Sequence, residues 1–85
     1  MEYNATVIFD VVLEHSEIDA LIDGFSGHGP VVAAWPDNRT AVIVTLDQPT
    51  LRDAADMAVV RAQRLTGRDA TAVEVLPTVD FDARN

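Results

Sequence analysis

The stretch GFSGHGP, residues 24–30, combines three glycines, a serine, a histidine and a proline, and it is the first place where the sequence suggests chemistry. A glycine-rich loop can hold a phosphate, and a serine near a histidine can act as a nucleophile with its base. A phosphate loop, however, leads from a strand into the N-terminus of a helix, whereas this stretch follows a helical pattern, and the chain contains no lysine. No third group that would orient His28 for Ser26 is evident. The sequence therefore predicts that residues 24–30 reverse the chain and do not catalyse a reaction.

The second histidine lies among carboxylates. His15 has Glu14, Glu17 and Asp19 close to it in the sequence, and this set could line a surface metal site. Metal sites also need supporting hydrogen bonds that a sequence does not display. We therefore expect a solvated corner between a strand and a helix, with no metal and no cofactor.

Two sets of charged residues are further candidates for a binding surface. Arg61, Arg64 and Arg68 follow one another at helical spacing and could bind an acidic partner or a phosphate. Arginines in the last turn of a helix also complement its dipole, and we expect that structural role here. The ten aspartates and Glu74 could imitate the phosphates of DNA, but they are scattered along the chain, as on a solubilising surface.

Composition restricts the class of protein. The chain has 85 residues, enough for one small domain with one core. It has no cysteine, which excludes disulfides, zinc–thiolate sites and thiol nucleophiles, and it has no apolar run of membrane-spanning length. A net charge of −8 repels nucleic acids and anionic lipids. The N-terminal residues do not read as a signal peptide, so we expect a cytoplasmic protein that binds neither membranes nor nucleic acid directly.

The first half of the chain predicts a strand, a helix and a hairpin. Residues 3–13 alternate as a strand. Ser16 and Asp19 have the spacing of a capping box, which predicts a helix from there to Phe25. Residues 31–35 and 40–46 read as two strands joined by the turn PDNR.

The second half predicts another helix and a last strand. Thr50 and Asp53 form a capping box, and Gly67 predicts the end of the helix that begins there. The alanines on its apolar side predict a close approach to the sheet. Residues 71–76 form the last strand, within a single domain over residues 1–79, followed by a polar tail over residues 80–85. The order β-α-β-β-α-β is that of an α+β, ferredoxin-like sandwich, a four-stranded antiparallel sheet with two helices on one face.

The sheet face away from the two helices is the most informative predicted surface. If Val7 and Val42 face the helices, their neighbours in the strands face outward. A solvated face should carry polar residues, but this one contains several apolar residues, and exposed apolar area commonly marks an interface. The candidate interface consists of Thr6, Ile8, Val12, Ala41, Ile43 and Thr45. A second copy of the chain or another protein is the expected partner, and no small-molecule substrate is evident.

The C-terminal third resembles a known family. The segment AVVRAQRLTGRDATAVEVLPTVDFDAR, from Ala58 to Arg84, is similar to a small α/β domain of actinobacterial and actinophage proteins that precedes an excisionase-like helix-turn-helix. In that family a strand like VEVLPT leads into an FD-R segment and then into the DNA-binding helices. The residues of that family that contact DNA have no counterpart in this chain, so no functional residue carries over from the resemblance.

Two functions therefore remain open from the sequence. The first is a non-catalytic interaction or dimerisation module of an actinobacterial or phage DNA-binding regulator. The second is a free-standing small acidic protein, phage-encoded for example, that binds and modulates a host protein, including by imitating DNA. An enzyme or a ligand sensor ranks third, because no pocket chemistry is visible in the sequence.

A first prediction concerns nucleic acid. Because the chain carries a charge of −8 and no lysine, we expect no binding to duplex DNA at physiological salt. Fluorescence anisotropy with a labelled duplex measures this. Salt-dependent binding in the micromolar range would contradict the expectation.

Overall fold

Four strands and three helices alternate along the chain. The structure, a computed structural model, describes residues 1–84, with side chains up to Ala83. In chain order the elements are β1 (Glu2–Phe9), α1 (His15–Gly24), β2 (Val31–Trp35), β3 (Arg39–Asp47), α2 (Leu51–Thr66), β4 (Ala72–Pro77) and α3 (Thr78–Arg84). The strands form one antiparallel sheet in the order β2-β3-β1-β4. The predicted α+β class and four-stranded antiparallel sheet are therefore confirmed.

The register of the central strand β1 divides the sheet into two faces. Val7 pairs with Val42 of β3 and Val73 of β4, whereas its neighbour Thr6 pairs with Ile43 and Glu74. Successive side chains of a strand point to opposite faces, so these two rows lie on opposite sides. The core is built on the face that carries Val7. Its fully buried side chains of largest volume are Phe9, Phe25, Leu21, Leu46, Val7, Val42 and Val44.

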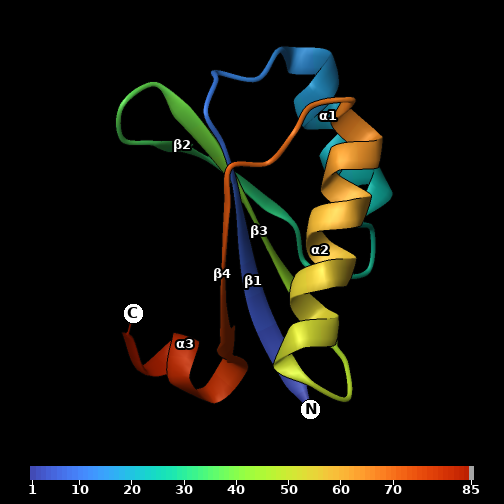
Figure 1. Cartoon of the computed structure of the whole chain (residues 1–85), viewed down its shortest axis with the longest axis vertical. Helices are drawn as coiled ribbons and strands as arrows, with labels where there is room; N and C mark the ends of the chain where they lie inside the picture. The colour runs from blue at the N-terminus through green and yellow to red at the C-terminus, as the bar shows by residue number, and fades with distance from the viewer. Residues whose placement is uncertain (85) are drawn as a thin grey trace.

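The helices α1 and α2 cover that core face together (Figure 1). Ala54, Ala58 and Ala62 of α2 are completely buried, so the helix lies close to the sheet as its alanines predicted. The two helices also approach each other closely. A Cβ added to Gly24 would overlap the side chain of Leu65. Residue 24 is therefore a glycine because α2 leaves no room there for a side chain.

The end of β1 differs from the prediction. The apolar alternation predicted a strand to residue 13, but β1 ends at Phe9. Beyond Phe9, backbone groups of the chain bond to the hydroxyl of Thr40 instead of to the backbone of β3. This hydroxyl accepts a hydrogen bond from Leu13 N at 3.0 Å and donates one to Val11 O at 2.9 Å. Residues 10–14 thus form a loop that is held against β3 by one side chain.

The start of α1 also differs from the prediction. The helix begins at His15 with Glu14 as its N-cap, two residues before the predicted cap Ser16. The side chain of Glu17 accepts a hydrogen bond from Glu14 N at 2.9 Å. Both boundaries of α2 agree with the prediction. Thr50 accepts from Asp53 N at 3.1 Å, and Gly67 has a φ of 70°.

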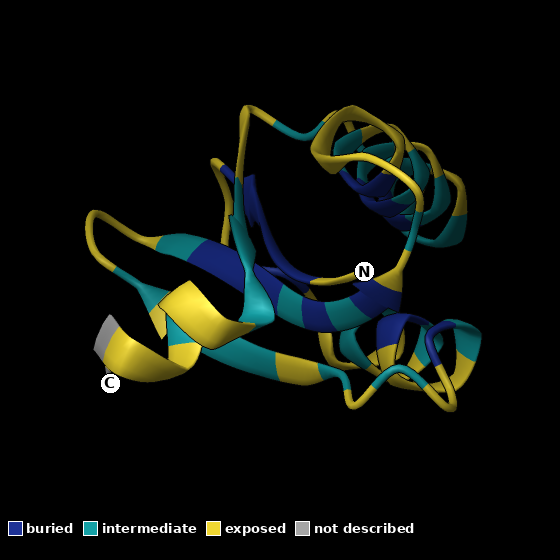
Figure 2. Cartoon of the chain, turned by 90° about the horizontal axis from the view of Figure 1, so that it is seen from below, coloured by how far each residue is buried: buried dark blue, intermediate teal, exposed yellow. Residues whose placement is uncertain are grey.

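The C-terminal segment is a helix rather than a polar tail. Residues 78–84 form α3, so the element order is β-α-β-β-α-β-α, one helix longer than predicted. α3 packs against β1 and β4 and lies on the opposite side of the sheet from α1 and α2, as Figures 1 and 2 both show. Phe81 is half-buried there. Residue 85, the end of the predicted tail, lies outside the described residues.

Within residues 1–84, no helix is both long and apolar enough to cross a membrane.

A second prediction tests the Thr40 contacts. The Thr40→Val substitution keeps the shape of the side chain but leaves the buried Leu13 N–H without its acceptor, which costs about 1–3 kcal/mol of unfolding free energy. Urea denaturation followed by circular dichroism measures the difference. Thr71→Val is the matched control, because its hydroxyl donates to Ile8 O, which also accepts from Thr71 N. Equal stability of the two variants would show that the Thr40 hydroxyl does not hold the loop.

Candidate functional site

The serine and histidine of the opening stretch lie in a turn. Ser26 is exposed and His28 is half-buried. Gly27 and Gly29 have positive φ angles of 89° and 58°, which the chain needs to reverse between α1 and β2. His28 O accepts from Thr45 N at 2.8 Å, so the turn is joined to β3 by its backbone. The geometry matches the predicted turn.

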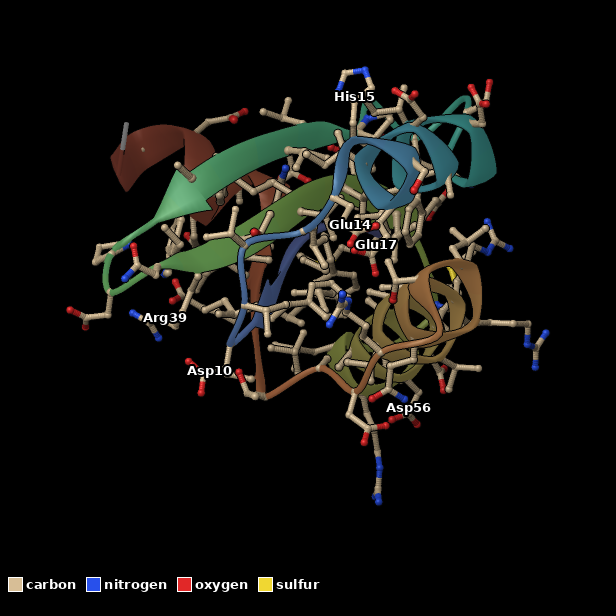
Figure 3. All side chains as sticks on the ribbon, turned by 90° about the horizontal axis from the view of Figure 1, so that it is seen from above. Asp10, Glu14, His15, Glu17, Arg39 and Asp56 are labelled. Atoms are coloured by element: carbon tan, nitrogen blue, oxygen red, sulfur yellow. The ribbon has the colours of Figure 1, made fainter. Side chains whose placement is uncertain are left out.

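The second histidine has one acidic neighbour within ion-pair distance among the residues that the structure describes. His15 Nε2 lies 3.7 Å from Asp19 Oδ2, and the His15 side chain is 93% exposed. Glu14 and Glu17 instead hold the start of α1. Among the described residues, no three histidine or acidic side chains are grouped to hold a metal ion. Figure 3 shows His15 at the outer side of the helix start.

The three arginines of the second helical pattern have separate environments. The guanidinium of Arg61 lies over the ring of Phe25, 5.7 Å from its centre. Arg68 Nε donates to Glu17 Oε2 and so joins the end of α2 to the start of α1. Arg64 is exposed. Two of the three therefore join α2 to α1 and its C-terminal end, a structural role other than the complementing of the helix dipole that the sequence suggested.

The contact between Arg68 and Glu17 changes the acidity of both groups. The hydrogen bond from Arg68 lowers the pKa of the Glu17 carboxyl, and the hydrogen bond from Glu14 N lowers it further. The same contact raises the pKa of the Arg68 guanidinium. The ion pair is therefore charged throughout the neutral pH range.

The sheet face opposite α1 and α2, called the outer face below, is the remaining candidate. The register arranges it in rows across the strands. One row contains Trp35 and Arg39; the next contains Ala33, Ala41, Ile8 and Ala72; the third contains Val31, Ile43, Thr6 and Glu74; the fourth contains Thr45, Asn4 and Leu76. The first three rows are called the upper outer face below.

Five of the six predicted interface residues lie on this face. Thr6, Ile8, Ala41, Ile43 and Thr45 share it by register. Val12 is not part of it, because β1 ends at Phe9, and Val12 is an exposed loop residue. Three of the five are shielded by their neighbours, since Thr6, Ile8 and Ala41 are at most 9% exposed. Ile43 and Thr45 are half-exposed.

Strand β2 supplies the accessible apolar area that the prediction missed. Val31 is 55% exposed, and Ala33 and Trp35 are half-exposed. The alternation of β2 is hard to see in VVAAW because both faces carry apolar residues. Val31 of β2 pairs with Ile43 of β3, so two accessible aliphatic side chains lie side by side on the outer face.

Charge is nearly absent from the upper outer face. Among its residues only Glu74 and Arg39 are ionisable, although the chain contains 14 acidic residues. The other end of the face is covered by α3. There the side-chain oxygens Asn4 Oδ1 and Thr78 Oγ1 are buried and have no hydrogen-bond partner among the described side chains. The accessible part of the face is thus apolar and close to neutral.

Comparison with known proteins adds no relative: no family model matches the chain, and neither does any of the curated proteins.

A third prediction tests the ion pair of Glu17. The Glu17→Gln variant keeps an acceptor for Glu14 N but loses the charge that attracts Arg68, so it should be less stable than the wild type at pH 7. Because the pKa of Glu17 is lowered on folding, its contribution is complete above the ordinary value of 4.5 and is lost as the pH falls through the lowered value. Urea denaturation between neutral and acidic pH measures the difference.

Asp23→Asn is the control for this prediction, because Asp23 is exposed on the same helix. A difference between wild type and Glu17→Gln that persists unchanged in acid, or a control with the same pH profile, would contradict the assignment.

Proposed function

We propose that this chain is a non-catalytic protein-interaction module that associates with a second copy of itself through the upper outer face. One observation carries the proposal: an apolar surface, including Val31 at 55% exposure beside Ile43, remains uncovered on a sheet whose opposite face holds the core. Exposed contiguous apolar area of this kind marks interaction sites. In addition, the serine, histidine and arginine groups that could do chemistry have structural or solvated positions.

Charge supports a second copy as the partner. Two chains of net charge −8 repel each other wherever carboxylates face carboxylates. The upper outer face carries only Glu74 as an acid, so docking through it brings neutral surfaces together and leaves most acidic groups in solvent. A symmetric pair of identical faces is the commonest arrangement in oligomers.

The size of the face sets the expected strength. Four strands about 4.8 Å apart and three rows about 7 Å apart span roughly 15 by 15 Å. A standard stable interface buries about 800 Å² on each partner. The face is smaller than this, so the proposed association is weak and reversible, with a dissociation constant on the order of tens to hundreds of micromolar.

The fold and the family resemblance support a more specific version of this proposal. We assign the core to the ferredoxin-like class, extended by α3, and the strand order β2-β3-β1-β4 with α1 and α2 on one face supports this. The resemblance of residues 58–84 supports a role in an actinobacterial or phage DNA-binding regulator of the cytoplasm. In that role the module would bring together two regulator chains without itself touching DNA.

A fourth prediction tests self-association. Ile43→Glu places a charge in the centre of the proposed interface, where it would be buried without a partner in the dimer. Sedimentation velocity over a range of concentrations up to about 1 mM should show reversible dimers of the wild type and folded monomers of the variant. Val31→Glu should have the same effect. Because Val31 is more exposed than Ile43, a charge there is less able to unfold the monomer, so a loss of dimer in this variant reports on the interface.

Val60→Glu is the matched control, since Val60 is an apolar residue of α2 that is 48% exposed and lies away from the sheet. It adds the same charge and should dimerise almost as the wild type does. A wild type that stays monomeric over this range, or a control that loses association equally, would overturn the proposal.

A further inference from the structure

A cavity lies at the turn end of the hairpin formed by β2 and β3, where its lining includes Val32 and Ala34 of the core face as well as Trp35 and Arg39 of the outer face. Its volume is about 290 Å³. The hairpin, the loop over residues 10–14 and Ile18 of α1 line it, and Val12, Ala34 and Asn38 of this lining are exposed. Its lining consists of Val12, Leu13, Ile18, Val32, Ala33, Ala34, Trp35, Asn38, Arg39 and Thr40.

The packing of the helices explains why this space is not filled. α2 packs mainly against β1 and β4, and α1 packs against the edge strand β2, so neither helix covers the turn end of the hairpin. The residues of β2 on the core face are Val32 and Ala34, and the small side chain of Ala34 leaves room above the strand. The loop over residues 10–14 forms the opposite wall, and the two hydrogen bonds of Thr40 hold that wall in place. The cavity is thus a built feature of the fold.

One cation lies at this apolar cavity. Among the described lining residues, Arg39 alone carries a charge. Its Nε donates to Pro36 O at 2.8 Å, which fixes the side chain and leaves the terminal guanidinium nitrogens available. Within the described part of the chain no carboxylate forms an ion pair with Arg39, although Figure 3 shows Asp10 at the same end of the molecule. A guanidinium binds a carboxylate through two parallel hydrogen bonds.

We propose that the cavity binds a small carboxylate with an apolar body. The carboxylate pairs with Arg39, and the body lies against Val32, Ile18 and Leu13. A volume of about 290 Å³ lies at the small end of the range for small-molecule sites, which suits a ligand of about ten non-hydrogen atoms. A phosphate fits less well, because its second negative charge would have no cation among the lining residues.

Phenylacetate is a suitable probe, and the neutral phenylacetamide is its control of equal size. Trp35 is the only tryptophan of the chain and lines the cavity, so its fluorescence reports binding. Titration at protein concentrations of a few micromolar should give a saturable change with phenylacetate at or below the millimolar range. The amide should bind at least tenfold more weakly, because it lacks the charge that Arg39 recognises.

Three variants separate the contributions to binding. Arg39→Gln should weaken phenylacetate binding at least tenfold and leave phenylacetamide nearly unchanged, while Arg39→Lys should keep part of the preference for the acid. Ala34→Phe should fill the cavity and abolish the binding of both probes. Arg64→Gln is the matched control, since Arg64 is exposed on α2 and away from the cavity; it should bind as the wild type does.

Circular dichroism checks that each variant is folded, and methyl chemical shifts of Val32 and Leu13 report binding independently of Trp35. Equal affinity for the acid and the amide would overturn the proposal. An Arg39→Gln variant that binds phenylacetate as well as the wild type, or the lack of saturation up to about 10 mM, would overturn it as well.

Discussion

The pairing of β1 along both of its edges is the constraint on which the two faces of the sheet depend. β1 is paired with β3 on one side and with β4 on the other, so its register assigns every neighbouring side chain to the core or to the outer face. A slip of one residue would exchange the faces completely. The sequence resists that slip because Ala5, Val7 and Phe9 are all completely buried, whereas Asn4 and Thr6 alternate with them. The position of the outer face is therefore a consequence of where the core lies.

The second constraint is the small amount of helix that the chain has for covering its sheet. The alanines of α2 and the bare Cα of Gly24 let α1 and α2 lie close to the sheet and to each other. Close packing gives a dense core from few residues, with α1 packed against β2 and α2 packed mainly against β1 and β4. The hairpin of β2 and β3 extends beyond them on one side, and only the short α3 reaches the other side. The cavity and the uncovered outer face thus have one common origin.

The sequence predicts those elements that carry their own local signals. The boundaries of α2 follow from Thr50 and Gly67, which have a capping side chain and a left-handed backbone, and the hairpin follows from a turn in which Asp37 and Asn38 have positive φ angles. The predicted end of β1 was wrong because a residue distant in the sequence determines where this strand stops pairing. The apolar residues 11–13 look like the continuation of a strand, but the hydroxyl of Thr40, 27 residues further on from Leu13, ends the pairing.

Other features had no readable signal. α3 has only seven residues, too few to show a helical period among polar side chains. The sequence indicated an apolar outer face, and five of the six residues chosen for it lie there by register. Their exposure was not readable, since it depends on the neighbours on adjacent strands that shield Ala41 and Thr6. The cavity could not be predicted from the sequence either, because its lining comes from three separate segments that only the fold brings together.

Arg39 connects the two proposed binding surfaces. It pairs with Trp35 in the first row of the outer face, and both residues also line the cavity. A carboxylate held by Arg39 would cancel the only positive charge of the upper outer face and would restrict the two side chains at its upper end. Binding in the cavity and association of two copies would then share a free energy of coupling, and thermodynamic linkage requires that each changes the other by the same factor. The physical reason for such coupling is local, since the wall of the cavity and the upper end of the interface are the same pair of residues.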